Sequence, residues 1–484
     1  MCGIIAIMHK DNTFLVEKAL KKIQHRGLDA SKIISFENYS FGFNRLAIND
    51  KSEIANQPYE YGNLIGLING EIYNFKELKK EYNLTTNSNS DTEIILPLFD
   101  KFGSSIIHYL DGFYSGIIYN KATNQLFFLR DYIGKKPLFY GTANEYEFIV
   151  NELKAVDTIS SFQIVPKGFS ELIDGTIKTI EYHNIPKNTE TNLKQIVTNA
   201  IEKRIPKEEK LFGVFLSGGL DSSIIAKVVS NLATNVIYYT LGNDNSQDLR
   251  FVKTLMKKLG MEQKLRIINL PDPIEIPELI NKVVYYTESY NPSIISNGLA
   301  TFLLSQAAHQ DGIKVVLSGE GADELFCGYP ISKDVNQWFE KRTELIENMH
   351  FTELRRLDLA SMAHTIEIRC PFLDREIYAA SNDCSLSELI KETRNGIIGK
   401  QILREAYAND IPSEIVERNK MSFDVGSGIR KLVVEYLTQN NKTEKEKLKE
   451  IWKNHFPDKL ANHEYFHSYP TFDKTIEKRG INHK

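Results

Sequence analysis

Residues 211–223, LFGVFLSGGLDSS, decide the fold of the second half of this chain. The apolar run 211–216 predicts a buried strand, and a helical apolar pattern follows over residues 222–233. Between them lies a glycine loop with hydroxyl side chains, and the backbone N–H groups of such a loop at the start of a helix can cradle a phosphate. The stretch therefore predicts a phosphate site, with Asp221 placed to hold Mg²⁺ against it.

The pattern continues downstream as alternating strands and helices. Residues 236–241 and 264–270 predict strands, and apolar residues between 251 and 259 have helical spacing. Alternation of this kind implies a parallel sheet covered on both faces. A further strand, 314–317, leads into a second glycine loop rich in acids, SGEGADELF at 318–326. Two such loops at the carboxyl ends of strands define a crevice of the kind in which α/β sheets bind nucleotides.

The first 180 residues follow a different rhythm. Short β-rich runs recur between turns, which predicts stacked antiparallel sheets with few helices. The change near residue 193 predicts a domain boundary, and the polar stretch 181–192 is the expected linker. Strands are predicted at 4–8, 39–48, 64–68, 114–119, 126–129, 137–140 and 147–150.

Length and composition limit the class of protein. A chain of 484 residues exceeds the size at which one core stops growing, so two domains are expected. The formal net charge of −4 argues against a nucleic-acid partner, and no run approaches the roughly 18 apolar residues of a membrane span. The four cysteines are sparse, which favours a reducing compartment, so we expect a cytoplasmic protein. The sequence leaves the oligomeric state open, with a homodimer among the alternatives.

The chain opens with Met1, Cys2 and Gly3. Because a small residue at position 2 favours removal of the initiator methionine, Cys2 would then carry a thiol and a free α-amino group. An α-amine has a pKa of about 8 and can act as the general base for a nucleophile on the same residue. Cys2 is therefore the predicted nucleophile of a first reactive site, distinct from the phosphate site.

Four polar residues predict the surroundings of this nucleophile. Asn69 and Gly70 follow a strand, so a side-chain amide and a backbone N–H could together stabilise an oxyanion. Arg45 can fork onto an α-carboxylate, while Glu71 and Asp91 can accept hydrogen bonds from an α-ammonium. For Asp91, a helix N-cap is an equally good interpretation. Such a set is suited to hydrolysis of the side-chain amide of glutamine.

These residues resemble the class II glutamine amidotransferases, and among them the glutamine-hydrolysing asparagine synthetases. The resemblance rests on CGI at 2–4, HRGLD at 25–29, NGEIYN at 69–74 and RDYIGKKPL at 130–138, and it departs at Leu28, where the family usually has proline. It implies an α+β antiparallel sandwich of the N-terminal nucleophile type over residues 2–185. The catalytic residues it implies are Cys2, Asn69 and Gly70, and the glutamine-binding residues are Arg45, Leu46, Ala47, Ile48, Asn49, Asn69, Gly70, Glu71 and Asp91.

The second half resembles the synthetase domain of the same family, an α/β ATP pyrophosphatase fold, over residues 193–455 and followed by a C-terminal tail at 456–484. The stretches DLASMAH at 358–364 and EIRCPFLD at 367–374 also match. By this resemblance Asp221 and Asp323 hold Mg²⁺. Glu320 helps to form an acyl-adenylate or to admit ammonia, and Lys420 reaches the pyrophosphate. The implied ATP-binding residues are Leu216, Ser217, Gly218, Gly219, Leu220, Asp221, Ser222, Ser223, Leu241, Ser318 and Gly319.

The resemblance implies ATP-dependent synthesis of asparagine from aspartate, with ammonia derived from glutamine. The expected intermediate is β-aspartyl-AMP, and the expected co-products are AMP, pyrophosphate and glutamate. Since ammonia would be protonated and lost in water, an apolar internal path between the two sites is implied.

The acceptor is the point at which the sequence departs from the family. Residues 290–297, YNPSIISN, lack the threonine and arginine common there, and DVGSG at 424–428 replaces the usual Ser-Asp-Gly. An arginine would be the natural clamp for the aspartate carboxylate, so Glu320, Ser293 and Ser296 are expected to replace part of it. The alternatives are an amidotransferase for another carboxylate, such as a cell-wall or sugar acid, a non-catalytic glutamine or ATP sensor, and a tRNA-modifying pyrophosphatase.

Overall fold

The computed structural model describes residues 1–8, 12–36, 38–144, 146–184, 192–329, 336–393 and 396–467. The chain divides into two compact units. The first comprises Met1–Ile185, Ile205–Lys210 and Ser361–Glu367, and the second comprises Pro186–Arg204, Leu211–Ala360 and Ile368–Lys484. Most of the expected linker, residues 185–191, lies outside the described residues.

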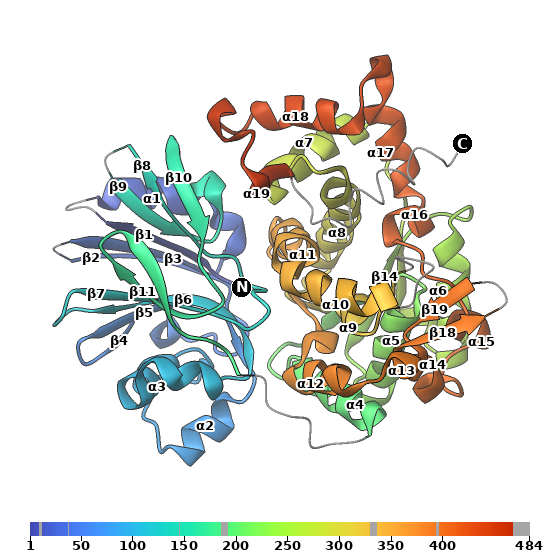
Figure 1. Cartoon of the computed structure of the whole chain (residues 1–484), viewed down its shortest axis with the longest axis horizontal. Helices are drawn as coiled ribbons and strands as arrows, with labels where there is room; N and C mark the ends of the chain where they lie inside the picture. Colours follow the sequence, from blue (N-terminus) through green and yellow to red (C-terminus); the bar gives the residue numbers. More distant parts are fainter. Residues whose placement is uncertain are drawn as a thin grey trace. The chain divides into compact units, whose positions relative to one another are not determined.

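The first unit contains two six-stranded antiparallel sheets (Figure 1). One has the order β10-β8-β9-β1-β3-β2 and the other the order β12-β11-β7-β6-β5-β4. The strands are β1 (Gly3–Met8), β2 (Ala30–Ser35), β3 (Tyr39–Arg45), β4 (Tyr59–Tyr61), β5 (Leu64–Ile72), β6 (Gly112–Asn120), β7 (Gln125–Arg130), β8 (Phe139–Ala143), β9 (Tyr146–Val150), β10 (Ile159–Ile164), β11 (Gly168–Ile173) and β12 (Thr176–Glu181).

Apolar side chains from both sheets share one core. Ile4 and Phe43 of the first sheet pack in the same cluster as Ile65, Ile117 and Phe128 of the second, and each is at most 1% exposed. Because strand side chains alternate between faces, these residues fix which face of each sheet is buried in the sandwich.

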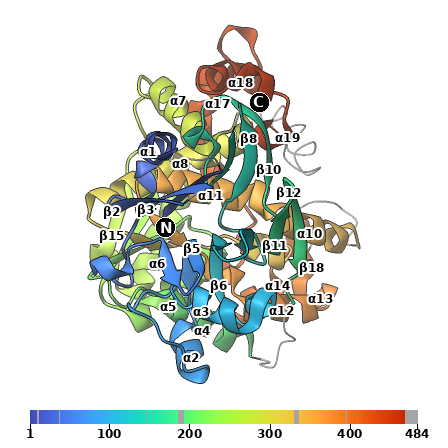
Figure 2. The ribbon, with the colours of Figure 1, turned by 90° about the vertical axis from the view of Figure 1, so that its left-hand side faces the viewer.

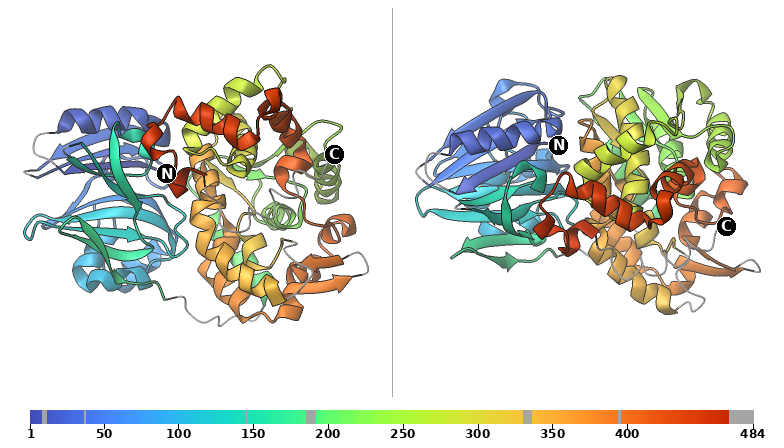
Figure 3. Two further views of the ribbon diagram at one scale, coloured as in Figure 1. Left: turned by 45° about the horizontal axis from the view of Figure 1, so that its top comes forward. Right: turned by 90° about the horizontal axis from the view of Figure 1, so that it is seen from above.

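Helices cover the outer faces of this sandwich. Helix α1 (Thr13–Lys22) buries Val16 and Leu20 against the first sheet, beside Gly42 of β3, where an added Cβ would lie 2.5 Å from Val16 Cγ1. Two further views show α1 along this sheet (Figures 2 and 3). Helices α2 (Phe75–Glu81) and α3 (Ile95–Phe102) pack on the second sheet through a separate apolar cluster. Each sheet is thus covered on part of its outer face by helices.

The second unit is built on a parallel sheet with the order β15-β14-β13-β16-β17. Its strands are β13 (Phe212–Phe215), β14 (Val236–Leu241), β15 (Leu265–Ile268), β16 (Val315–Leu317) and β17 (Glu367–Arg369). A small hairpin adds β18 (Ile390–Thr393) and β19 (Gly396–Gly399). The helices are α4 (Leu193–Arg204), α5 (Leu220–Leu232), α6 (Gln247–Leu259), α7 (Ile276–Thr287), α8 (Pro292–Gln310), α9 (Ala322–Leu325), α10 (Asn336–Asn348), α11 (Glu353–Met362), α12 (Arg375–Asp383), α13 (Leu386–Leu389), α14 (Gln401–Tyr407), α15 (Ser413–Val416), α16 (Phe423–Ser427), α17 (Ile429–Leu437), α18 (Glu444–Lys453) and α19 (Glu464–His467).

The strand order places a switch point beside β13. Strand β14 pairs on one side of β13 and β16 pairs on the other, so the loops that follow β13 and β16 diverge at neighbouring strand ends. Crevices at such points are the usual ligand sites of open parallel sheets. The predicted fold class is confirmed in both halves, with an antiparallel sandwich first and a parallel α/β sheet second.

Several predicted boundaries are wrong. The strand predicted at 39–48 ends at Arg45, and the strand predicted at 64–68 continues through Ile72. The predicted tail at 456–484 does not begin at 456, because Phe456, Tyr465 and Phe466 are buried in the second unit. As far as the structure describes the chain, that unit therefore continues to His467.

Candidate active sites

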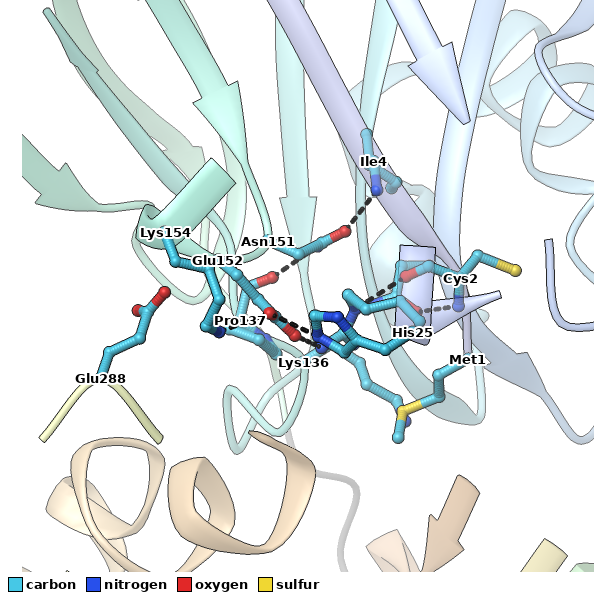
Figure 4. Close-up of polar contacts among 12 residues, drawn as sticks. Met1, Cys2, Ile4, His25, Lys136, Pro137, Asn151, Glu152, Lys154 and Glu288 are labelled. Atoms are coloured by element: carbon cyan, nitrogen blue, oxygen red, sulfur yellow. Dashed lines mark hydrogen bonds and ion pairs between the residues drawn. The ribbon is translucent and has the colours of Figure 1, made fainter. Parts of the chain in front are cut away.

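Three side chains hold the backbone around Cys2. The Cys2 N–H donates to Asn69 Oδ1 at 2.8 Å, and Arg26 Nε donates to the Cys2 carbonyl at 3.1 Å. The Ile4 N–H donates to Asn151 Oδ1 at 2.7 Å, while Asn151 Nδ2 donates to the Pro137 carbonyl at 2.8 Å (Figure 4). These hydrogen bonds thus fix the start of the chain at Cys2 and at the beginning of β1.

A buried carboxylate organises the cations behind Cys2. Glu152 Oε1 lies 2.6 Å from the Arg26 guanidinium, and Glu152 Oε2 lies 2.9 Å from His25 Nε2 and 2.5 Å from Lys154 Nζ (Figure 4). Burial acts to raise the pKa of Glu152, but Lys154, His25 and Arg26 outweigh it and hold that pKa well below the usual range. Because Arg26 also binds the Cys2 carbonyl, Glu152 connects this charge network to the predicted nucleophile.

The surroundings of the chain start favour an uncharged amine. The Met1 ammonium lies 3.2 Å from Glu367 Oε2 and is buried. Burial lowers the pKa of this ammonium, although Glu367 opposes the shift. Burial likewise raises the pKa of the Cys2 thiol, whose Sγ lies 4.0 Å from the Leu46 carbonyl. Burial thus disfavours the charged form of both the Met1 amine and the Cys2 thiol.

Asn69 and Gly70 lie where a developing oxyanion beside Cys2 could be bound. Asn69 Oδ1 is engaged by Cys2, whereas Asn69 Nδ2 is buried and has no hydrogen-bond partner among the described residues. Gly70 permits a close strand approach, since an added Cβ would lie 2.3 Å from the Phe113 carbonyl oxygen. A buried amide donor adjacent to a nucleophile is the arrangement expected of an oxyanion hole.

The other residues predicted to bind glutamine gather in loops near Cys2. Arg45 ends β3, and its guanidinium donates to the Ser52 carbonyl at 2.7 Å and to Asn56 Oδ1 at 2.9 Å. The loop that follows, Leu46 to Ile48, is buried, and the Ala47 N–H donates to Asp29 Oδ2 at 2.7 Å.

Asp91 links two of the predicted glutamine-binding segments. Its Oδ1 accepts from Asn49 Nδ2 at 2.9 Å, and its Oδ2 accepts from the Ile72 N–H at 2.7 Å. Helix α3 begins after Ile94, so Asp91 is not its N-cap and that alternative is wrong. Glu71 is buried in β5 next to Asn69 and Gly70. The set predicted for one ligand therefore lies on neighbouring strands and loops.

A cavity of about 180 Å³ lies at the carboxyl ends of β13 and β16 in the second unit. Both predicted glycine loops line it. Its polar and charged lining includes Ser217, Asp221, Ser222, Ser293, Asn297, Thr301, Ser318, Gly319, Glu320, Asp323, Glu353, Arg356 and Lys420.

The first glycine loop has the geometry of a turn into a helix. Gly218 has a φ of +65°, Gly219 is the N-cap of α5, and the Ser217 N–H donates to Ser222 Oγ at 3.2 Å. Arg418 donates to the Gly218 carbonyl at 3.0 Å. The second loop approaches closely, because a Cβ on Gly319 would lie 2.9 Å from the Asp221 Cβ. Glycines are thus required where the two loops meet.

Two lysines neutralise the predicted metal ligands. Lys400 Nζ lies 2.6 Å from both Asp221 Oδ2 and Asp323 Oδ1, and Lys420 Nζ lies 2.6 Å from Asp323 Oδ2. Burial acts to raise the pKa of Asp323, but Lys400 and Lys420 outweigh it and lower that pKa to about 2. Burial raises the pKa of Asp221.

Among the described residues no group of three or more His, Cys, Asp or Glu side chains forms a metal site, so the predicted Mg²⁺ would have two protein carboxylates as ligands. Asp221 and Asp323 offer the oxygen ligands that Mg²⁺ prefers. Asp221 Oδ1 is buried and accepts no hydrogen bond from the part of the chain that the structure describes.

The predicted ATP-binding residues divide into two groups. Leu216, Ser217, Asp221, Ser222, Ser318 and Gly319 line the cavity. Gly218, Gly219, Leu220 and Ser223 shape the turn and the first turn of α5, and Leu241 is the buried last residue of β14.

Sequence reasoning did not identify several residues of these sites. Lys400 and Arg418 stand in the stretches KQILR at 400–404 and RNKMSF at 418–423, in which only Lys420 was given a role. The burial of Lys400, Arg418 and Glu152 against charged partners reveals their part in the sites. Arg418 binds Asp248 at 2.5 Å, and burial, opposed by Arg418, raises the pKa of Asp248 to about 6. In the sequence, the network around Glu152 is signalled by the neighbouring basic residues His25 and Arg26, which lie in the stretch HRGLD at 25–29.

Comparison with known families agrees with this two-site geometry. Residues 1–202 match the family described as glutamine amidotransferase domain, and residues 192–350 and 337–471 match the family described as asparagine synthase. The fold and sites define an amidotransferase in which a glutaminase unit is joined to a synthase unit. The chain belongs to the family of glutamine-hydrolysing asparagine synthetases, which are ligases.

Similarity to individual proteins extends over most of the chain. A Methanocaldococcus jannaschii protein, provisionally named asparagine synthetase [glutamine-hydrolyzing] 1, is 30% identical over 90% of this chain and 95% of its own length. The asparagine synthetase [glutamine-hydrolyzing] of Gallus gallus is 28% identical over 88% of this chain and 84% of its own. Among solved structures, glutamine phosphoribosylpyrophosphate amidotransferase from B. subtilis is 16% identical, with a TM-score of 0.35, over 71% of this chain and 89% of its own. None of the described helices is long and apolar enough to cross a membrane.

Proposed function

We propose that this enzyme makes asparagine from aspartate in an ATP-dependent reaction, with ammonia released from glutamine at Cys2. The proposed intermediate is β-aspartyl-AMP, and the proposed products are asparagine, glutamate, AMP and pyrophosphate. The family supports glutamine-dependent asparagine synthesis. The observation that carries the glutaminase half is the buried, unpartnered Asn69 Nδ2 beside Cys2, among the described residues. We place the enzyme in the cytoplasm.

In the first unit the proposed chemistry follows from the contacts of Cys2. After removal of Met1, the Cys2 amine takes the thiol proton and the sulfur attacks the glutamine carboxamide. Asn69 Nδ2 and the Gly70 N–H stabilise the resulting oxyanion. Arg45, Glu71 and Asp91 bind the head group of glutamine. Arg26, held by Glu152, fixes the Cys2 carbonyl and therefore the direction of the thiol.

In the second unit the two glycine loops bind ATP. The carboxylates beside them hold the metal ion, and the lysines stabilise the negative charge of the phosphates. Asp221 and Asp323 would hold Mg²⁺, which neutralises phosphate charge when it is bound. Lys420 stabilises negative charge on the departing pyrophosphate, and Lys400 pairs with both carboxylates and holds them close together. Glu320, at the mouth of the second loop, assists attack on the adenylate.

The proposal is tested by product analysis. The purified enzyme is incubated with ATP, Mg²⁺, glutamine and aspartate, and asparagine, glutamate, AMP and pyrophosphate should appear in equal amounts. ADP with phosphate would instead indicate an acyl-phosphate route and contradict the adenylate mechanism. A panel of other carboxylates, including uronic acids, tests whether a different acceptor is amidated.

A further inference from the structure

Helix α8 gives the cavity a neutral polar wall. Ser293, Asn297 and Thr301 line the cavity at intervals of four residues, so they share one face of the helix. Ser296, where the family commonly has arginine, is fully buried and donates to Asp424 Oδ2 at 2.7 Å. It does not line the cavity, so its expected part in a carboxylate clamp is not supported. An acceptor must find its cation on another element.

Among the residues that the structure describes, two cationic side chains line the cavity. Lys420 is paired with Asp323 of the second glycine loop. Arg356 comes from α11, and its NH2 group lies 2.6 Å from Glu320 Oε1, with 12% of the side chain exposed. The guanidinium is therefore held in place at the cavity wall, next to the residue of the second loop proposed to assist the chemistry.

The charges that line the cavity favour a role for Arg356 in binding an anionic acceptor. Within the described part of the chain, four carboxylates line the cavity, namely Asp221, Glu320, Asp323 and Glu353, against Lys420 and Arg356. A polyanionic nucleotide adds further negative charge. An anionic acceptor needs a fixed positive partner in such a site, and a guanidinium can bridge two carboxylates because it has five N–H donors in one plane.

We propose that Arg356 is the residue that selects the acceptor, by binding a carboxylate other than the one that is activated. The acceptor is then a dicarboxylate, with its amino group facing Glu320 and Glu353. This inference rests on the proposed function and assigns the α-carboxylate of aspartate to Arg356. Glu320 positions the guanidinium, and Ser293, Asn297 and Thr301 supply neutral hydrogen bonds.

The test compares aspartate with β-alanine, which lacks only the α-carboxylate. Wild type, Arg356→Gln and Arg356→Lys are assayed for acceptor-dependent AMP formation with ammonium chloride as the nitrogen source. Arg266→Gln, on an exposed arginine that pairs with Asp311, is the matched control. Loss of a charge-assisted fork should raise the KM for aspartate about tenfold or more in Arg356→Gln, with a smaller increase in Arg356→Lys. The KM for ATP and the use of β-alanine should stay within about threefold of wild type.

A merely structural role predicts a different result. It would lower kcat for both acceptors, or the melting temperature, without changing the preference for aspartate over β-alanine. If Arg356→Gln leaves that preference unchanged, the assignment is overturned; if Arg356→Gln does not fold, the preference of Arg356→Lys decides. If the wild-type enzyme forms no AMP with aspartate, the proposed function fails. The Arg356 variants are then assayed with the acceptor that the enzyme does use. A monocarboxylate acceptor would then overturn this inference as well.

Discussion

Asn69 makes two separable contributions, and one substitution divides them. Its Oδ1 accepts from the Cys2 N–H at 2.8 Å, and its Nδ2 is the buried donor without a partner among the described residues. Asn69→Asp keeps an oxygen for the Cys2 N–H but replaces the donor with a carboxylate oxygen of nearly the same shape. The oxyanion would then face a negative charge or, if that carboxyl is protonated, a differently placed donor.

The expected loss follows from the role of that donor. Removing one oxyanion-hole donor typically costs about 10²- to 10³-fold in kcat, or roughly 3–4 kcal/mol of barrier. Asn69→Asp should lose at least this much glutaminase kcat, because repulsion is added to the missing bond. Asn69→Ala should lose a similar amount and also loosen Cys2, since the contact with its N–H disappears.

The assay is steady-state release of glutamate from glutamine, alongside asparagine formation driven by ammonium chloride. Ammonium-driven synthesis should stay near wild type in both variants, which shows that the second unit is folded. A glutaminase kcat for Asn69→Asp within about threefold of wild type would refute the assignment of Asn69 Nδ2 to the oxyanion.

Three further outcomes are expected. Cys2→Ala should abolish glutamine use and spare ammonium-driven synthesis; equal loss with both nitrogen donors would exclude two separate sites. Asp323→Asn should abolish pyrophosphate release while glutamate release continues, as measured by paired product assays, since it removes a charge shared by Lys400 and Lys420. Glu152→Gln should lower glutaminase kcat by a larger factor than it changes the KM for glutamine. It should also lower the unfolding free energy by about 3–5 kcal/mol at neutral pH, because the buried cations lose their partner. Since the pKa of Glu152 is lowered on folding, that stability difference should be full above pH 4.5 and shrink as pH falls towards the lowered pKa, which acid titration of both proteins would show.

The fold was predictable where sequence periodicity reports burial directly. Strand β13 and helix α5 carry a continuous apolar run and a helical apolar pattern, so the phosphate loop between them could be placed from letters alone. Edge strands β2 and β12 were missed because neither has a buried apolar face in the sequence pattern, and both expose polar residues such as Lys32 and Lys178. Helix α8 was missed because buried apolar residues occupy most of its circumference, so that Ser293, Asn297 and Thr301 leave only a weak amphipathic period.

The sites show the same division in physical terms. Cys2 and Asp221 could be predicted because each lies in a short stretch that by itself indicates its chemistry. Cys2 stands at the chain start, and Asp221 stands in a glycine loop. Glu152 and Lys400 could not, because their roles depend on partners more than 100 residues away in sequence, as Arg26 is from Glu152 and Asp221 is from Lys400.

Position 296 shows how a local departure from a family pattern can mislead. A serine in place of arginine suggested that the hydroxyl itself takes over the acceptor, yet the side chain is turned to Asp424, another position where this sequence departs. A buried hydroxyl next to a buried carboxylate satisfies both groups, so the two departures compensate each other locally. Neither then supplies a charge to the cavity. The positive partner that we propose for the acceptor comes from a third element, α11, whose Arg356 is the one arginine that lines the cavity among the described residues.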